Sequence, residues 1–282
     1  MPVPALGPLE ALRRHWPEYA IEGWALGMFM ISASVATVLL YDPRSPTFGL
    51  IENEFWKRAL MALAMAGTAA AIIYSPWGKR SGAHMNPAFT LSFWVMGKIN
   101  TVDAVYYALF QFVGGLAGSL LSYVLTGGLL ADPQANWAAT VPGPQGVAAA
   151  LFSELIIAFI LMFVVAVMLN SKFDQLIGIV AGGLIFLYVL YESPYSGFGM
   201  NPARSFSSAL PADTWTAFWV YLIAPPTGML TAVFVHSYVL GLPADFTQPK
   251  LNPNYVTRCI HSGFEPPRSR PRTTSRCLTI GT

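Results

Sequence analysis

The chain has 282 residues, of which 54% are hydrophobic and only 11% are charged. A soluble domain carries about 25% charged residues, so this composition excludes an ordinary soluble protein and indicates an integral membrane protein. The formal net charge of +2 is too small to indicate nucleic acid as a partner.

Six stretches are apolar enough to cross a bilayer. In chain order they are Ile21–Tyr41, Ala59–Tyr74, Ala104–Leu125, Val147–Leu169, Leu176–Tyr191 and Trp215–Leu240. The second and fifth are short against the ~20 residues that a span needs, so we expect them to begin a turn earlier or to tilt little. The first is too long for the core of a signal peptide and no convincing cleavage site follows it, which indicates an uncleaved span.

One tripeptide occurs twice in apolar surroundings, as Asn86-Pro87-Ala88 and as Asn201-Pro202-Ala203. The contexts match as well, since SGAHMNPAFTL surrounds the first copy and SGFGMNPARSF the second. Two copies in equivalent places indicate an internal duplication whose function lies at these points.

The tripeptide predicts the start of a helix, because Asn is a preferred N-cap and Pro is favoured at the first helical position. We expect short helices from Pro87 to about Met96 and from Pro202 to about Leu210. Inside a membrane, the unpaired N–H groups at such a start are tolerated only where they line a polar cavity. If the side-chain oxygen of each Asn caps its helix, the NH2 group is free to donate into a pore.

Each half of the chain has a long span, a short span, a half-helix and another long span. Three spans are an odd number, so the second half enters the membrane from the opposite side and the half-helices meet near the midplane. The predicted fold class is an all-α membrane protein with six transmembrane helices and two re-entrant half-helices in an inverted repeat. The predicted channel domain covers residues 21–242, with halves at about 21–130 and 147–242, after an N-terminal segment of residues 1–20.

Positive charges predict the orientation. They gather in the N-terminus, in the connectors after spans two and four, and in the tail, namely at Arg13, Arg14, Lys79, Arg80, Lys98, Lys172, Lys250 and Arg258. By the positive-inside rule both termini are cytoplasmic. Residues 243–282 are rich in Pro, Arg, Ser and Thr without hydrophobic periodicity, so we expect a disordered cytoplasmic tail.

Small residues predict where spans approach closely. Glycines at spacings of three and four fall on one face of span three and one face of span five, at Gly114, Gly115, Gly118, Gly178, Gly182 and Gly183. Both cysteines lie in the tail and the four histidines show no metal-ligand spacing, so we expect no disulfide, metal or cofactor. No nucleophile–base pair or phosphate loop is present, and we expect no enzyme.

With these motifs, Ile21 to Leu240 resembles the aquaporin (major intrinsic protein) family. The resemblance rests on SGAHMNPAFT and GMNPARSF, on Glu22 and Glu154 near the starts of spans one and four, and on Gln111 before Gly114-Gly115. It implies a homotetramer in the lipid bilayer of the cell membrane, in which each protomer has its own pore. That pore would pass water or small neutral solutes and exclude protons and ions.

The resemblance also implies roles for single residues. Asn86 and Asn201 would be donors at the midplane, and Arg204 would lie at the outer constriction, where it donates to solute and repels cations. Glu22 and Glu154 would accept from backbone N–H groups of the re-entrant loops, or else mark the membrane–water interface. Gln111 of span three would help to support the loops. His84 would face the pore or stabilise its own loop.

The three other constriction positions, counted from the motifs, are Ala66, Val189 and Phe198. Water-selective members have a bulky aromatic at the first and His at the second, so we expect a wider and less polar filter here. Phe198 resembles the glycerol-conducting branch, unless it belongs to an aromatic belt. The remaining signals are mixed. Ala209 and Tyr221 resemble the water-selective members and Leu222 resembles the glycerol-conducting branch, but Ser205 stands where that branch has Asp.

The sequence therefore predicts a passive channel for water and small uncharged solutes of the glycerol, urea, ammonia or peroxide class. A strict water channel is the nearest alternative, and a non-conducting adhesion or scaffold protein on the same fold is another. An ion channel or secondary transporter is disfavoured, because the spans contain almost no ionisable residues beyond Glu22 and Glu154.

Overall fold

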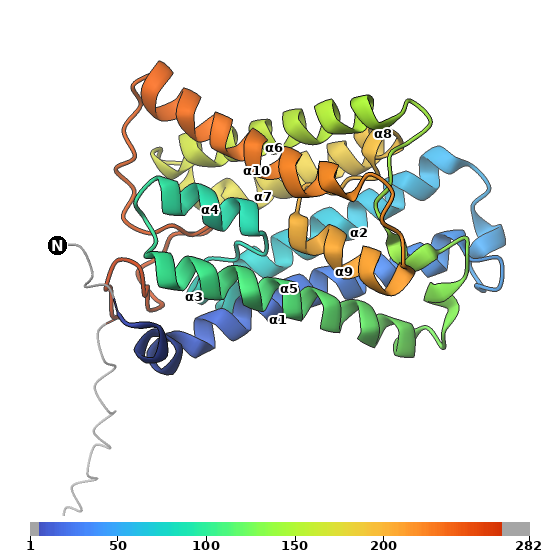
Figure 1. Cartoon of the computed structure of the whole chain (residues 1–282), viewed down its shortest axis with the longest axis horizontal. Helices are drawn as coiled ribbons and strands as arrows, with labels where there is room; N and C mark the ends of the chain where they lie inside the picture. The colour runs from blue at the N-terminus through green and yellow to red at the C-terminus, as the bar shows by residue number, and fades with distance from the viewer. Residues whose placement is uncertain (1–5, 267–282) are drawn as a thin grey trace, which may run out of the picture.

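The computed structural model describes residues 6–266, and its secondary structure in this range is helical (Figure 1). Within these residues, six helical segments are long and apolar enough to cross a membrane. They are Pro8–Tyr41, Glu54–Tyr74, Thr101–Leu125, Val147–Leu169, Asp174–Ser196 and Phe218–Val239. The predicted all-α fold class with six spans is confirmed.

The spans differ from the prediction mainly at their starts. Helix α1 (Pro8–Tyr41) begins with Pro at its first position, well before Ile21, so most of the expected N-terminal segment is helical. Helix α2 (Glu54–Tyr74) begins about a turn earlier than Ala59, because Asn53 caps it and accepts from Phe55 N at 2.9 Å.

The remaining spans follow the predicted ranges closely. They are α5 (Thr101–Leu125), α6 (Val147–Leu169), α7 (Ile177–Leu187) and α10 (Phe218–Phe234). Helix α7 continues through a π-helical turn at Tyr188–Glu192 into α8 (Ser193–Ser196). The fifth span is therefore one irregular segment that leads into the second Asn-Pro-Ala motif.

Both predicted half-helices are present, as α4 (Pro87–Val95) and α9 (Pro202–Ala212). A short helix α3 (Pro76–Ser81) precedes the first of them. Figure 1 shows α4 and α9 running from the middle of the bundle toward opposite ends. This is the arrangement that an inverted repeat requires.

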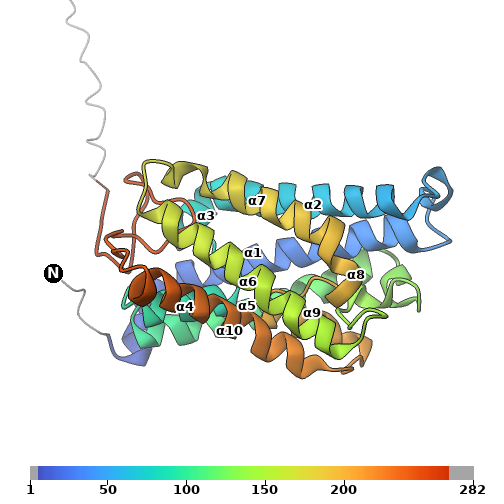
Figure 2. The same cartoon turned by 90° about the horizontal axis from the view of Figure 1, so that it is seen from above.

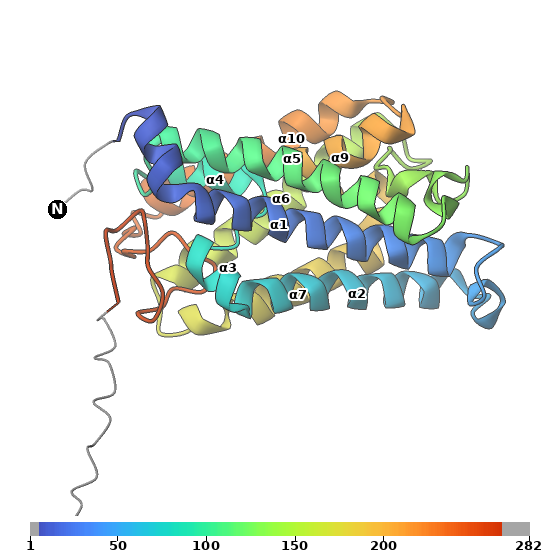
Figure 3. The same cartoon turned by 90° about the horizontal axis from the view of Figure 1, so that it is seen from below.

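Glycines allow α1 and α5 to touch through their backbones (Figure 3). A Cβ added to Gly114 would lie 2.1 Å from the carbonyl oxygen of Gly23, and one added to Gly118 would lie 2.4 Å from that of Gly27. The second half has a matching contact between α6 and α10, which lie side by side in Figure 2. There a Cβ on Gly228 would lie 2.3 Å from Leu155 O. Gly183, by contrast, faces open space.

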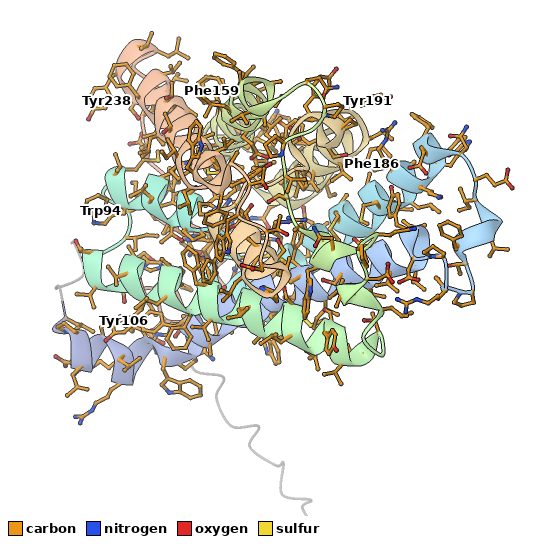
Figure 4. The ribbon with its side chains drawn as sticks, turned by 45° about the vertical axis from the view of Figure 1, so that its right-hand side comes forward. Trp94, Tyr106, Phe159, Phe186, Tyr191 and Tyr238 are labelled. Atoms are coloured by element: carbon orange, nitrogen blue, oxygen red, sulfur yellow. The ribbon has the colours of Figure 1, made fainter. Side chains whose placement is uncertain are left out.

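The outside of the bundle is apolar. Large aromatic side chains such as Trp94, Tyr191 and Tyr238 are exposed at its periphery (Figure 4). A surface of this kind matches lipid rather than water.

The start of α1 and residues 243–266 lie at the same end of the bundle, which we call the terminal end (Figure 1). The expectation of a disordered tail is wrong for residues 243–266. Lys250, Leu251 and Asn252 are buried there because the segment packs against α3 and the first loop. The later tail residues, including Arg268, Arg270, Arg272, Arg276 and Cys277, lie outside the described residues.

Candidate pore

The two motif asparagines are the N-caps of the half-helices. Asn86 Oδ1 accepts from Ala88 N at 2.9 Å, and Asn201 Oδ1 accepts from Ala203 N at 3.0 Å and from Arg204 N at 3.2 Å. Pro87 and Pro202 occupy the first helical positions, as the motif predicts.

Each asparagine also bonds to the opposite half of the chain. Asn86 Nδ2 donates to Met200 O at 2.8 Å, and Asn201 Nδ2 donates to Met85 O at 2.6 Å. An amide NH2 group has two N–H bonds, so one is used between the halves and one is left. The expectation of a fully free NH2 group is therefore corrected to a single N–H per asparagine.

The loops before the two motifs have the same unusual backbone. Ala83 and Met85 have φ angles of 54° and 52°, and Phe198 and Met200 have φ angles of 57° and 51°. Such left-handed conformations cost on the order of 1–3 kcal/mol each in non-glycine residues. They persist only where surrounding groups hold them.

Two buried glutamates hold these loops. Glu22 accepts from His84 N at 3.1 Å and from Met85 N at 2.7 Å. Glu154 accepts from Gly199 N and Met200 N, both at 2.6 Å. Both glutamates are completely buried, so they support the loops and do not mark the membrane–water interface.

Further groups complete the support in both halves. Gln111 Nε2 donates to Glu22 Oε2 at 2.9 Å. Tyr107 OH donates to Ser81 O at 2.7 Å, and in the second half Tyr221 OH donates to Ser196 O. Sequence reasoning missed this pairing of tyrosines, although each lies near the start of the last span of its half.

A central cavity of about 70 Å³ passes between the two motifs. Its wall contains Asn86, Asn201, Phe198, Arg204 and His84. A second cavity, of about 320 Å³, lies toward the end opposite the termini and shares Phe198 and Arg204 with the first. We call it the outer cavity. The two cavities share part of their walls, so together they extend from the two motifs toward the end opposite the termini.

The outer cavity brings together three of the four predicted filter residues, Val189, Phe198 and Arg204. Helix α2 contributes Met65 to this wall and not Ala66. The carbonyl oxygen of Ala66 faces α7, since a Cβ on Gly182 would lie 3.2 Å from it. The structure therefore places Met65, and not Ala66, at the cavity wall beside Val189, Phe198 and Arg204.

Arg204 is the cation of this site. The residue is 8% exposed, and its Nη1 has no hydrogen-bond partner among the described residues. Arg204 lines both cavities, and a guanidinium group carries N–H donors and no acceptor. Its backbone N–H is already bound by Asn201.

His84 lies at the wall of the central cavity and contacts two neighbouring groups. Its ring nitrogens contact Thr90 Oγ1 at 3.1 Å and Pro249 O at 2.8 Å. Across residues 6–266, no cluster of His, Cys, Asp and Glu has the arrangement that a metal ion needs.

Comparison with known proteins agrees with this geometry. A family model described as "Major intrinsic protein" matches residues 16–236. Aquaporin NIP1-4 of Oryza sativa subsp. japonica is 36% identical over 181 residues, which are 64% of this chain and 64% of the rice protein. Aquaporin NIP2-3 of Zea mays is 32% identical over 220 residues, which are 76% of this chain and 70% of the maize protein.

A solved structure shares the fold. The X-ray structure of the aquaglyceroporin from Plasmodium falciparum superposes with a TM-score of 0.69 at 22% sequence identity. The match covers 80% of this chain and 97% of that chain. At this identity the likeness concerns the fold alone.

Proposed function

Because the chain belongs to the major intrinsic protein family, we propose that it is a passive membrane channel for water and small uncharged solutes of the glycerol, urea, ammonia or peroxide class. The observation that carries the proposal is that Asn86, Asn201 and Arg204 line one cavity between the opposed half-helices. All three are hydrogen-bond donors, and solutes of this class carry acceptor atoms.

The exclusion of cations follows from the same groups. The N-terminal end of a helix carries about half a positive charge, and two such ends, at α4 and α9, lie at the middle of the path. Arg204 adds a full charge next to them. A cation that enters meets repulsion in a narrow site of low dielectric, where charges interact more strongly than in water.

The exclusion of ions in general follows from the rest of the wall, which is apolar. Its aliphatic and aromatic members include Leu26, Phe29, Ile73, Leu161 and Ile185. An ion would lose its water shell here without replacement, and the free energy of this desolvation is much larger than that of a neutral solute. A neutral solute regains its hydrogen bonds at the asparagines and Arg204.

Stopped-flow light scattering on proteoliposomes tests the proposal. We expect water permeability well above that of empty liposomes, together with uptake of glycerol or urea, and no proton flux or single-channel current. Permeability equal to that of empty liposomes, in protein that is folded by circular dichroism, would leave the non-conducting scaffold as the better description.

One observation favours a second candidate, a strict water channel. Met65 occupies the wall where the sequence placed Ala66, so the outer filter has more bulk than expected. Phe198 adds an aromatic ring to the same wall. Fast water flux without glycerol or urea flux would select this candidate.

Orientation and assembly complete the proposal. We propose that the terminal end is cytoplasmic in the cell membrane, because the basic residues of the N-terminus, of the connectors after spans two and four, and of residues 243–266 gather there. Protease digestion of the tail in sealed right-side-out vesicles tests this orientation. A homotetramer rests on the family resemblance, and mass measurement in detergent tests it.

A further inference from the structure

The two re-entrant loops are equivalent, but different segments of the chain lie against them. In front of the second loop lies the outer cavity, whose wall includes Gly197. In front of the first loop, at the terminal end, residues 249–251 fill the corresponding space. A Cβ on Gly82 would lie 3.0 Å from Pro249 O and 3.3 Å from Lys250 Cγ. A Cβ on Gly197 would likewise lie 3.2 Å from Val141 N, so a remote segment covers each loop. At the terminal end that segment is the chain that returns after α10.

This returning segment touches the pore directly. Leu251 N donates to Gly82 O at 2.9 Å, and Pro249 O lies 2.8 Å from His84 Nε2. The Leu251 side chain lines the central cavity and is only 3% exposed. It thus lies between the cavity and the solvent at the terminal end.

Lys250 anchors the segment. It is 1% exposed, and its Nζ donates at 2.9 Å to Lys79 O of α3, which joins the segment to the bundle, and at 2.9 Å to Arg258 O of the tail itself. Lys79 lies in the last turn of α3, where backbone carbonyls carry partial negative charge. No carboxylate within residues 6–266 forms an ion pair with Lys250. Burial of an ammonium group among neutral acceptors carries a desolvation cost, which opposes docking.

The connection to α10 permits release. Residues 240–243 are exposed, and Gly241 has a φ of 60°. Residues 241–258 contain no helix or strand, so undocking breaks no regular structure. Figure 3 shows the segment beside α3 at the end of the bundle.

We infer that residues 248–252, here called the closing segment, are a detachable closure of the pore at the terminal end. Leu251 is the side chain that blocks the path, and Lys250 is the anchor that keeps it docked. The inference rests on the proposed function for its effect on flux, but docking itself is measurable without flux.

Thiol labelling of the full-length protein measures docking. Leu251→Cys is made in a background with Cys259→Ser and Cys277→Ser, and it is compared with Val256→Cys, since Val256 is 79% exposed. We expect slow labelling at position 251 and fast labelling at position 256. Lys250→Glu places a carboxylate against carbonyl oxygens and should therefore release the segment. We expect the labelling rate at position 251 to rise on the order of tenfold or more, which is the effect of losing a hydrogen bond from a charged donor. Lys172→Glu, an exposed charge reversal, is the matched control and should change nothing.

Water permeability of proteoliposomes measures closure. Lys250→Glu and Leu251→Ala should each raise it several-fold, and Leu251→Trp should lower it. Val256→Ala and Lys172→Glu should leave it unchanged. Size-exclusion profiles and thermal unfolding of each variant verify that the bundle is folded, and Leu251→Ala gives a second test if Lys250→Glu does not fold.

The outcomes separate the two proposals. Equal labelling rates at positions 251 and 256 in the otherwise unmodified protein would overturn the inference, because the segment would not be docked. Unchanged water permeability in Leu251→Ala and Leu251→Trp, in a protein that conducts, would overturn it as well. Labelling as expected without flux in any variant would support the closing segment and refute the channel function.

Discussion

Glu154 and Glu192 share one hydrogen-bonding partner. Ser196 Oγ lies 2.6 Å from Glu154 Oε1 and 2.5 Å from Glu192 Oε1. A hydroxyl group has a single proton, so one of the two carboxyl groups must supply the proton for the other contact. Glu154 already accepts from the N–H groups of Gly199 and Met200, which leaves Glu192 as the donor.

This proton placement predicts different effects of two similar substitutions. Glu192→Gln should change stability little, because the amide NH2 donates to Ser196 as the protonated carboxyl does. Glu154→Gln should destabilise by about 1–3 kcal/mol, because one backbone N–H then faces an NH2 group instead of an acceptor. Thermal unfolding in detergent compares the two. Equal destabilisation by both would show that the proton is placed wrongly.

Asn201→Ala should lower both stability and water permeability. It removes the cap of α9, worth about 1 kcal/mol, and leaves Met85 O without its donor. Asn86→Ala should act in the same direction, since it removes the cap of α4 and the bond to Met200 O.

The control is Asn53→Ala, because Asn53 caps α2 away from both cavities. It should cost stability without lowering the water permeability of the folded protein. Normal flux in the Asn201→Ala and Asn86→Ala variants would contradict the role of these donors.

Met65→Ala should widen the outer filter and raise glycerol and urea permeability more than water permeability. The reason is that Met65 shares the cavity wall with Val189, Phe198 and Arg204. Ala66→Gly is the neighbouring control and should leave the solute-to-water ratio unchanged. Stopped-flow measurements on both variants compare the two positions. A solute-to-water permeability ratio that changes in Ala66→Gly alone would show that Ala66, and not Met65, is the filter residue.

Gly114→Ala should destabilise the bundle strongly, because the new Cβ would lie 2.1 Å from Gly23 O. Overpacking of this kind costs about 1–3 kcal/mol or more. Gly183→Ala, with nothing within 4 Å of the new Cβ, should be neutral or slightly stabilising. The order of the two melting temperatures is the measurement, and a Gly114→Ala variant as stable as the unmodified protein would contradict the close α1–α5 contact.

Acid should release the tail through His261. Burial lowers the pKa of His261 from 6.5 to about 3 in the docked chain. The groups around it are Tyr107, Asp103, His84, His15 and Lys250, of which Asp103 opposes the shift and the other histidines and Lys250 favour it. A released His261 returns to its ordinary pKa. Below pH 6.5 the released chain therefore binds one more proton, and docking weakens by up to about 1.4 kcal/mol per pH unit.

Labelling of the Leu251→Cys variant tests this sign. The rate should rise on acidification from about pH 7.5 to about pH 5.5, after correction for the reagent with Val256→Cys. His261→Gln should remove most of the pH dependence. An equal rise with and without His261 would assign the effect to another group.

The sequence by itself determined the half-helices, the duplication and the order of the spans. These features are local or repeated. The start of α4 at Pro87 depends on Asn86 and its neighbours alone, and apolar length alone predicts a span. The supporting carboxylates Glu22 and Glu154 were found through the resemblance, and the structure shows the backbone groups that they bind.

Only the tertiary structure decided which side chains line the path. Adjacent residues on a helix point about 100° apart, so the rotational position of α2 in the bundle decides whether Met65 or Ala66 faces the cavity. The docking of Leu251 depends on its contact with Gly82, which is remote in the chain. The closing segment has no hydrophobic periodicity from which its position could be predicted. The proton of Glu192 likewise depends on a hydroxyl group that the π-helical turn and α8 bring to Glu154.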